Sequence, residues 1–124
     1  MLRILAGEFR GRLLASPKNR DVRPTTARVR QSLFGRLAPR LDGARFLDCF
    51  AGSGLMGFEA LSRGAAFVLA LENDRTHCDL IRRNAGALRL GADRHALRHA
   101  DVLKAIAQPC AEAPFDIAFA DPPY

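Results

Sequence analysis

The sequence predicts an α/β fold in which parallel strands alternate with helices, and three observations support this prediction. The apolar run 66–71 is continuous, which is typical of a strand buried on both faces of a parallel sheet. Apolar residues recur at helical spacing in the following segment, 75–89. A third stretch, 46–54, passes from an apolar run through Asp48 into a glycine-rich turn, as a strand does before the first helix of a nucleotide-binding sheet.

The N-terminal residues predict a β-hairpin. Short apolar runs at 2–5 and 12–15 surround a turn that is bounded by glycines. Phe9 lies near this turn beside Arg10, and two interpretations remain open for it. Its ring could stack on a nucleic-acid base between phosphate-binding arginines, or it could pack on the domain.

A loop and a helix are expected between the hairpin and the sheet. Residues 16–24 contain two prolines and no periodicity, which indicates a loop. Thr25 or Thr26 can cap the following helix, which we expect to end at Pro39. Arg28 falls in its first turn, where the helix dipole disfavours a cation, so it either contacts an anion such as a ligand carboxylate or is an ordinary exposed arginine. The apolar positions with helical spacing are Val29, Leu33, Phe34 and Leu37.

The remaining elements follow in alternation to the end of the chain. Glycines and prolines mark most of their boundaries. The expected order is a strand at 45–50, a helix from Gly54 to near Gly64, a strand at 66–71, a helix at 75–89, a weakly apolar edge strand at 95–100, a short helix at 102–107 and a strand at 115–120.

Charge is distributed unevenly along the 124 residues. The formal net charge is +6, yet residues 1–45 alone carry eleven arginines and lysines against three acids. A strongly basic N-terminal segment followed by a nearly neutral remainder favours a polyanionic partner. An arginine-rich surface without a partner gives the same composition. No apolar run reaches the roughly 18 residues that span a membrane, and the N-terminus does not read as a signal peptide. The three cysteines fit no zinc or redox spacing, so we expect free thiols in a reducing cytoplasm and no metal.

Acids stand at or near the ends of the predicted strands. Asp48 lies in the first strand, and Glu72, Asp101 and Asp121 follow later ones. An acid about 20 residues after the glycine turn commonly binds ribose hydroxyls. Gly52-Ser53-Gly54-Leu55-Met56-Gly57 matches G-x-G-x-x-G, but a pyrophosphate beside so many carboxylates is unfavourable. The acids suit a cationic nucleoside such as S-adenosylmethionine better than NAD, although Asp101 could equally cap the short helix that follows it.

The motifs together resemble the RsmD family of ribosomal RNA guanine-N2 methyltransferases, which have the Rossmann-like class I methyltransferase fold. The resemblance covers the whole chain and rests on four motifs that occur in order. These are Arg3-Ile4-Leu5-Ala6-Gly7 through Gly11-Arg12-Leu13, Arg23-Pro24-Thr25-Thr26-Ala27-Arg28-Val29-Arg30-Gln31-Ser32-Leu33-Phe34, Leu47-Asp48-Cys49-Phe50-Ala51-Gly52-Ser53-Gly54 and Asp121-Pro122-Pro123-Tyr124.

The resemblance implies a role for each motif. The cofactor would be S-adenosylmethionine, with Asp48, Gly52 and Gly54 at its methionine end, Glu72 at the ribose, Asp101 at the adenine, and Thr25 and Arg28 over its carboxylate. Asp121 and the carbonyl oxygen of Pro122 would accept hydrogen bonds from the target amine, Pro122 and Pro123 would hold a rigid turn, and Tyr124 would stack on the extruded base. We expect ribosomal RNA, within an assembling small subunit, as the partner of Arg3, Arg10, Arg12 and Arg23.

The implied organisation is a basic hairpin and loop at 1–24 followed by a cofactor-binding domain at 25–124. Members of the family continue beyond Asp-Pro-Pro-Tyr with three more strands, so we expect this chain to lack part of the sheet. On that expectation the isolated chain would be marginally stable and show little methyl transfer. An NAD-dependent oxidoreductase and a non-catalytic RNA-binding module remain the alternatives.

Overall fold

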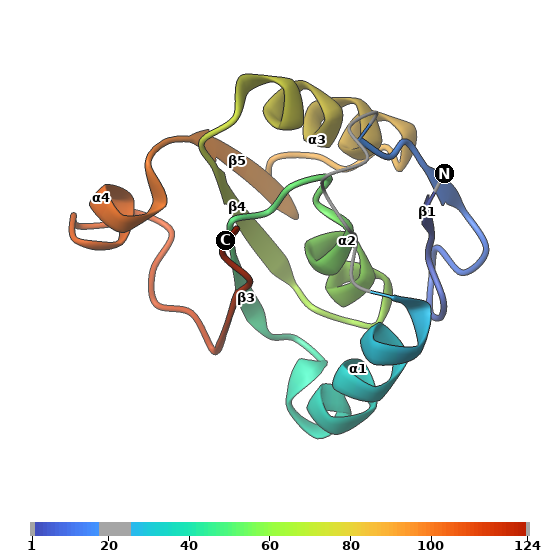
Figure 1. Ribbon diagram of the computed structural model, residues 1–124. Coiled ribbons are helices and arrows are strands. Elements are labelled where there is room, and N and C mark those ends of the chain that lie inside the picture. The colour runs from blue at the N-terminus through green and yellow to red at the C-terminus, as the bar shows by residue number, and fades with distance from the viewer. Residues whose placement is uncertain (1, 18–25, 124) are drawn as a thin grey trace.

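The computed structural model describes residues 2–17 and 26–123, and it contains two sheets and four helices (Figure 1). A small antiparallel pair is followed by a four-stranded parallel sheet of order β5-β4-β3-β6. This order and the alternation of strands with helices confirm the predicted α/β fold. The elements are β1 Leu2–Arg3, β2 Leu13–Leu14, α1 Ala27–Leu41, β3 Arg45–Cys49, α2 Leu55–Ser62, β4 Phe67–Glu72, α3 Arg75–Ala87, β5 His95–His99, α4 Val102–Ile106 and β6 Ile117–Ala120.

The register of the parallel sheet brings the carboxyl ends of its central strands together. Cys49 of β3 is paired with Leu71 on one side and with Ala120 on the other. The segments that leave β3, β4 and β6 therefore emerge at the same edge of the sheet. Every residue of β4 is buried, as the continuous apolar run predicted. β5 lies at an edge of the sheet, also as predicted.

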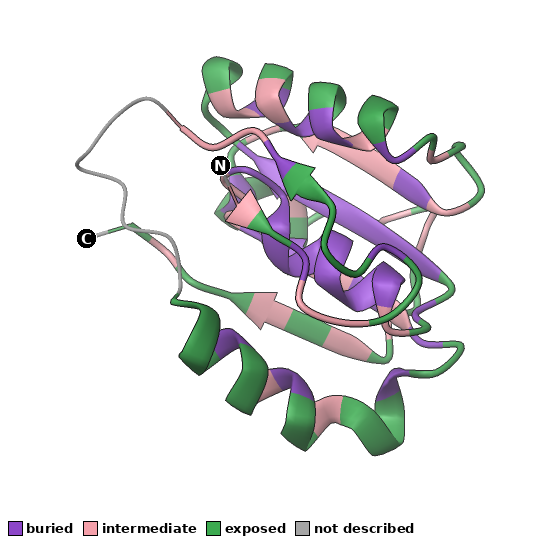
Figure 2. Ribbon diagram, turned by 90° about the vertical axis from the view of Figure 1, so that its right-hand side faces the viewer, coloured by how far each residue is buried: buried purple, intermediate pink, exposed green. Residues whose placement is uncertain are grey.

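The two faces of the sheet are covered unequally. One face packs against α2, which is buried along its whole length and is covered in turn by the hairpin (Figure 2). The other face is covered by a smaller cluster around Leu69, Leu71 and Val102, the first residue of α4. Within the described residues, no helix is both long and apolar enough to cross a membrane.

The expected end of α1 at Pro39 is wrong. The helix continues through Pro39 to Leu41, because Pro39 lies in the last turn, where it removes a single hydrogen bond, and because Leu41 is only 2% exposed and anchors that turn. Val29, one of the apolar residues at helical spacing, is exposed, and Arg30 is buried instead. The N-cap is Thr26, whose hydroxyl accepts a hydrogen bond from the Val29 amide.

The buried carboxylate of Glu59 explains the burial of Arg30. Glu59, in α2, is 0% exposed, and its Oε1 lies 3.4 Å from Nε of Arg30. Its Oε2 accepts a hydrogen bond from Nε of Arg63 at 3.0 Å, and its two oxygens accept the amides of Leu5 and Ala6. A charge in the protein interior needs such partners. Glu59 thus ties the hairpin, α1 and α2 together.

The hairpin shares the main core of the domain. Phe9 is only 8% exposed and belongs to the same cluster as Ile4 and Phe58, so it packs on the domain rather than standing free for a base. The amide of Phe9 donates to Oγ of Ser62 at 2.8 Å. The predicted division between residues 24 and 25 lies outside the described residues and stays a prediction.

Candidate cofactor and substrate site

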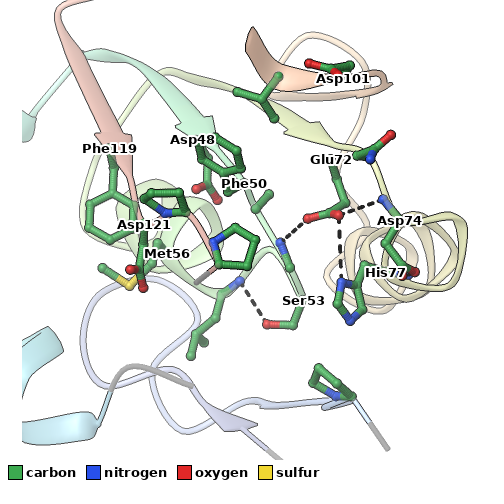
Figure 3. A pocket seen from close by; sticks show the side chains of 18 of the residues that line it. Asp48, Phe50, Ser53, Met56, Glu72, Asp74, His77, Asp101, Phe119 and Asp121 are labelled. Atoms are coloured by element: carbon green, nitrogen blue, oxygen red, sulfur yellow. Dashed lines mark hydrogen bonds and ion pairs between the residues drawn. The ribbon is translucent and has the colours of Figure 1, made fainter. Parts of the chain in front are cut away.

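A cavity of about 770 Å³ opens at the carboxyl edge of the parallel sheet (Figure 3). Its volume is in the range of sites for small molecules and cofactors. One end is formed by Asp48, Met56, Phe119 and Asp121, and the other by Glu72, Asp74, His77 and Asp101. The remaining lining residues are Pro17, Phe50, Ala51, Gly52, Ser53, Leu55, Asn73, Val102, Leu103, Pro122 and Pro123.

The glycine loop forms one wall of this cavity. The backbone turns through positive φ at Phe50, Gly52 and Gly54, with φ values of 57, 60 and 84°. A Cβ at Gly54 would lie 2.6 Å from the ring of Phe58 in α2. Position 54 therefore requires glycine if Phe58 is to pack against the loop. A Cβ at Gly52 would meet no protein atom within 4 Å, and Gly52 itself lines the cavity. The loop therefore leaves its backbone accessible to a ligand.

Glu72 connects the glycine loop to the start of α3. Its Oε1 accepts the Gly52 amide at 2.7 Å and its Oε2 accepts the Asp74 amide at 2.8 Å, as drawn in Figure 3. Nδ1 of His77 lies 3.7 Å from the same Oε2. Glu72 is 8% exposed, so the part of the carboxylate that remains accessible faces the cavity.

Asp48 is the most deeply buried acid of the site. It is 1% exposed, and its Oδ2 accepts a hydrogen bond from the Gly57 amide at 3.3 Å. Burial raises the pKa of Asp48 to about 7, the Gly57 amide opposes this shift, and the nearby charge of Glu72 adds to it. A cation bound next to Asp48 would stabilise its ionised form.

The field in the cavity is negative. Five carboxylate side chains line it, and no lysine or arginine does so among the residues that the structure describes. This contrasts with the formal charge of +6 on the chain. Such a site favours a ligand that carries positive charge over a polyanion.

The structure brings most of the predicted cofactor and substrate residues to the cavity. Asp48, Gly52, Glu72, Asp101, Asp121, Pro122 and Pro123 all line the cavity, and Gly54 is buried in its loop. Asp101 also caps α4, because its carboxylate accepts the Lys104 amide at 3.2 Å. Arg28 is exposed on α1 and is not among the lining residues, whereas Arg23, Thr25 and Tyr124 lie outside the described residues. The roles assigned to all of these residues stay predictions.

The arginines of the hairpin region differ in their contacts. Arg12 donates from Nη2 to the carbonyl oxygen of Ala87, at the end of α3, at 2.8 Å. Arg3 donates to the carbonyl oxygen of Gly11 at 3.2 Å. Arg10 is exposed, and its guanidinium makes no hydrogen bond or ion pair within residues 2–17 and 26–123. Of the three, Arg10 therefore offers the least constrained guanidinium.

Sequence reasoning missed several residues that shape the site. His77 contacts Glu72 from the first turn of α3, a position that carries no motif. Asn84 is 2% exposed, and its place on the apolar face of α3 with Cys78 and Ile81 was a signal that the sequence offered. In the part of the chain that is described, no group of three or more His, Cys, Asp or Glu side chains could hold a metal ion.

Comparison with solved structures defines the class of the fold. A putative methyltransferase from Escherichia coli superposes with a TM-score of 0.87 at 40% identity, over 99% of this chain and 64% of that one. A putative methylase from Haemophilus influenzae gives a TM-score of 0.79 at 37% identity, over 99% and 65% of the two chains. The fold is the Rossmann-like sheet of the class I methyltransferases, as predicted.

Sequence comparison then gives the family. The family model described as "Conserved hypothetical protein 95" matches residues 2–124, and the chain belongs to this family. It is 42% identical over 123 residues to ribosomal RNA small subunit methyltransferase D of Escherichia coli, which confirms the predicted relationship to the RsmD family. The match covers 99% of this chain and 60% of that relative, so the chain spans about three fifths of the relative's length.

Proposed function

We propose that this chain forms the S-adenosylmethionine-binding part of a methyltransferase that modifies ribosomal RNA of the small subunit. The observation that carries the proposal is the cavity with five carboxylates beside the glycine loop. The ligand has a sulfonium and an ammonium group, and both gain energy from nearby carboxylates. A dinucleotide would place its pyrophosphate against the same acids, which disfavours the NAD-dependent alternative.

Residues at both ends of the cavity would hold the cofactor. Asp48 and the backbone of Gly52 and Gly54 would hold the methionine end, and Glu72 would accept hydrogen bonds from the ribose. Asp101 would bind the adenine amino group at the far end. Thr25 and Arg28 would bind the cofactor carboxylate. When bound, S-adenosylmethionine supplies a methyl group that its sulfonium already activates.

The residues after β6 would orient the nucleotide that is methylated. We assign Asp121 and the carbonyl oxygen of Pro122 as acceptors for the two N–H bonds of an exocyclic amine, which we propose is N2 of a guanine. The amine is a weak nucleophile because its lone pair is delocalised into the ring, and two acceptors favour the pyramidal form that exposes it. Pro123 would keep this turn rigid, and Tyr124 would stack on a base that has left its helix. Positioning of the two reactants then supplies much of the catalysis.

The RNA would be held by the basic N-terminal region. Arg3, Arg10 and Arg12 belong to the hairpin region, and Arg23 follows it in the sequence. Arginines bind phosphate through a planar, bidentate guanidinium, which suits ribosomal RNA in an assembling small subunit. Such a substrate would place the enzyme in the cytoplasm.

Calorimetric titration with S-adenosylhomocysteine and with NAD tests the proposal directly. We expect saturable binding of S-adenosylhomocysteine at a ratio of one per chain, and no heat of binding with NAD. Binding of NAD alone would favour the oxidoreductase, and binding of RNA without either nucleotide would favour a non-catalytic RNA-binding module. An Asp121→Ala variant should bind S-adenosylhomocysteine as the parent chain does, because Asp121 is assigned to the target amine.

A further inference from the structure

Asn84 of α3 is a buried polar side chain that the cofactor contacts proposed above do not use. It is 2% exposed and lies between the glycine loop and the segment that leaves β2. Its Oδ1 accepts the Ala15 amide at 2.8 Å, and its Nδ2 donates to the Ala15 carbonyl oxygen at 3.1 Å. The same Nδ2 donates to the carbonyl oxygen of Ser53 at 3.2 Å. The amide group is therefore fully engaged on two segments of backbone.

These two segments are far apart in the sequence but both reach the cavity. Ser53 belongs to the glycine loop and lines the cavity. Ala15 lies two residues before Pro17, which also lines the cavity. The two hydrogen bonds between Asn84 and Ala15 join α3 to the segment that follows β2. Asn84 is thus the point at which α3 fixes two parts of the cavity wall relative to each other.

We infer that Asn84 is a positioning residue for the cofactor site, acting through Ser53 and through the segment Ala15–Pro17. This inference rests on the proposed function. The carbonyl oxygen of Ser53 sits between Gly52 and Gly54, so its direction sets the orientation of the adjoining peptide groups. Holding these groups in place before the ligand arrives lowers the entropy lost on binding. Asn84 would therefore determine affinity although it does not line the cavity.

Asparagine is the side chain that this position requires. Its oxygen and its two N–H bonds match one amide and two carbonyl groups, and a buried group left without a partner is costly. Aspartate has nearly the same shape, but it would point an oxygen at the carbonyls of Ala15 and Ser53. Asn84→Asp therefore keeps the volume and the bond to the Ala15 amide, and removes only the two donated bonds.

The test compares Asn84→Asp and Asn84→Ala with Ser62→Ala. Ser62 is also buried and bonds to the hairpin through Phe9 and Ala6, but it does not line the cavity and contacts neither Ser53 nor Ala15. Each variant is checked by circular dichroism and thermal unfolding, and then titrated with S-adenosylhomocysteine. We expect both Asn84 variants to bind S-adenosylhomocysteine about tenfold more weakly. This is about the effect of losing one hydrogen bond that orders the site. Ser62→Ala should lower the melting temperature without changing affinity.

The outcomes separate this inference from the proposed function. If the parent chain does not bind S-adenosylhomocysteine, the proposed function fails. If the parent chain binds it and folded Asn84→Ala binds equally well, Asn84 is only a structural residue and the inference is wrong. If Ser62→Ala loses as much affinity as the Asn84 variants, loss of hairpin packing in general explains the effect, and the inference is again wrong. Should Asn84→Asp fail to fold, Asn84→Ala decides.

Discussion

The amide of Gly52 donates a hydrogen bond to Oε1 of Glu72 at 2.7 Å across 20 residues of sequence. The glycine loop after β3 and the end of β4 are thereby held together by the acid that we assign to the cofactor ribose. The second oxygen of Glu72 accepts the Asp74 amide at 2.8 Å. Glu72 therefore orders the loop, and this structural role can be separated experimentally from the ribose-binding role that we propose for it.

Replacing Glu72 should affect both functions. Glu72→Ala removes two charge-assisted hydrogen bonds to backbone amides, each worth about 1.5–3 kcal/mol where it is shielded from solvent. We expect a lower melting temperature and a loss of S-adenosylhomocysteine affinity in calorimetry. Glu72→Gln can still accept the Gly52 amide and should keep more stability than affinity. Unchanged affinity in both variants would remove Glu72 from the site.

Ligand binding should be linked to ionisation of Asp48. Burial raises the pKa of this group to about 7, so at lower pH much of the free protein carries a proton there. The sulfonium and ammonium groups of S-adenosylmethionine favour the ionised form, and binding should release this proton. We expect affinity to increase with pH up to about 7 and to level off above it, with up to one proton released at low pH. Titrations in buffers of different ionisation enthalpy measure the released protons directly.

The matched variant for this experiment is Asp48→Asn. An asparagine oxygen can still accept the Gly57 amide, as Oδ2 of Asp48 does at 3.3 Å, but the side chain no longer titrates. Its affinity should be lower and independent of pH over the same range. The free energy of unfolding of the parent chain without ligand should change with pH in the opposite direction to the affinity. The raised pKa of Asp48 contributes stability that is present below pH 3.8 and is lost as the pH rises through about 7. A parent chain that releases no proton on binding at any pH would contradict the assignment of Asp48.

His95 should make the fold sensitive to mild acid. Its ring stacks on Phe58 with the centroids 4.8 Å apart, its Nε2 is buried with no hydrogen-bond partner in the described structure, and burial lowers its pKa to about 4. The unfolded chain binds a proton near pH 6.5, so stability is lost as the pH falls from there through about 4. His95→Phe keeps the stacking and removes the titration. Melting temperatures measured across this range should fall less in the variant, and equal slopes would contradict the prediction.

The sheet was predictable because its signals are local and strong, whereas the side chains that join distant segments were not. The apolar run of β4, the glycines at 52 and 54, and the acids after the strands each identify themselves in the sequence. Arg30 and Glu59 look like ordinary surface charges on two helices, and only the fold brings them within 3.4 Å of each other. The extension of α1 past Pro39 depends on burial of Leu41, which is a tertiary effect.

Removing the carboxylate of Glu59 should unfold the N-terminal part of the structure. Glu59→Ala leaves the buried guanidinium of Arg30 without its counter-charge, and it leaves the amides of Leu5 and Ala6 without their acceptor. Breaking a buried pair by removing one partner costs about 3–5 kcal/mol, a large part of the stability of a small domain. Denaturant unfolding should show this loss, and hydrogen exchange should place it in the hairpin. The exposed pair Arg82 and Asp79 is the control, and Asp79→Ala should change stability by less than about 1 kcal/mol.

The contacts of the hairpin arginines predict different effects on RNA binding. The guanidinium of Arg10 makes no hydrogen bond within the described part of the chain, whereas that of Arg12 donates to the Ala87 carbonyl oxygen at 2.8 Å. Arg10→Ala should weaken RNA binding, leave the melting temperature unchanged and reduce the slope of log affinity against log salt by about 0.7–0.9, the value for one lost phosphate contact. Arg12→Ala should lower the melting temperature as well, because it detaches the hairpin from the end of α3. A filter-binding or anisotropy titration against a fragment of small-subunit ribosomal RNA at several salt concentrations measures both slopes.

Asp79→Ala on α3 serves as a control that increases positive charge outside the hairpin. If Arg10→Ala leaves the slope unchanged, the RNA is held elsewhere on the molecule.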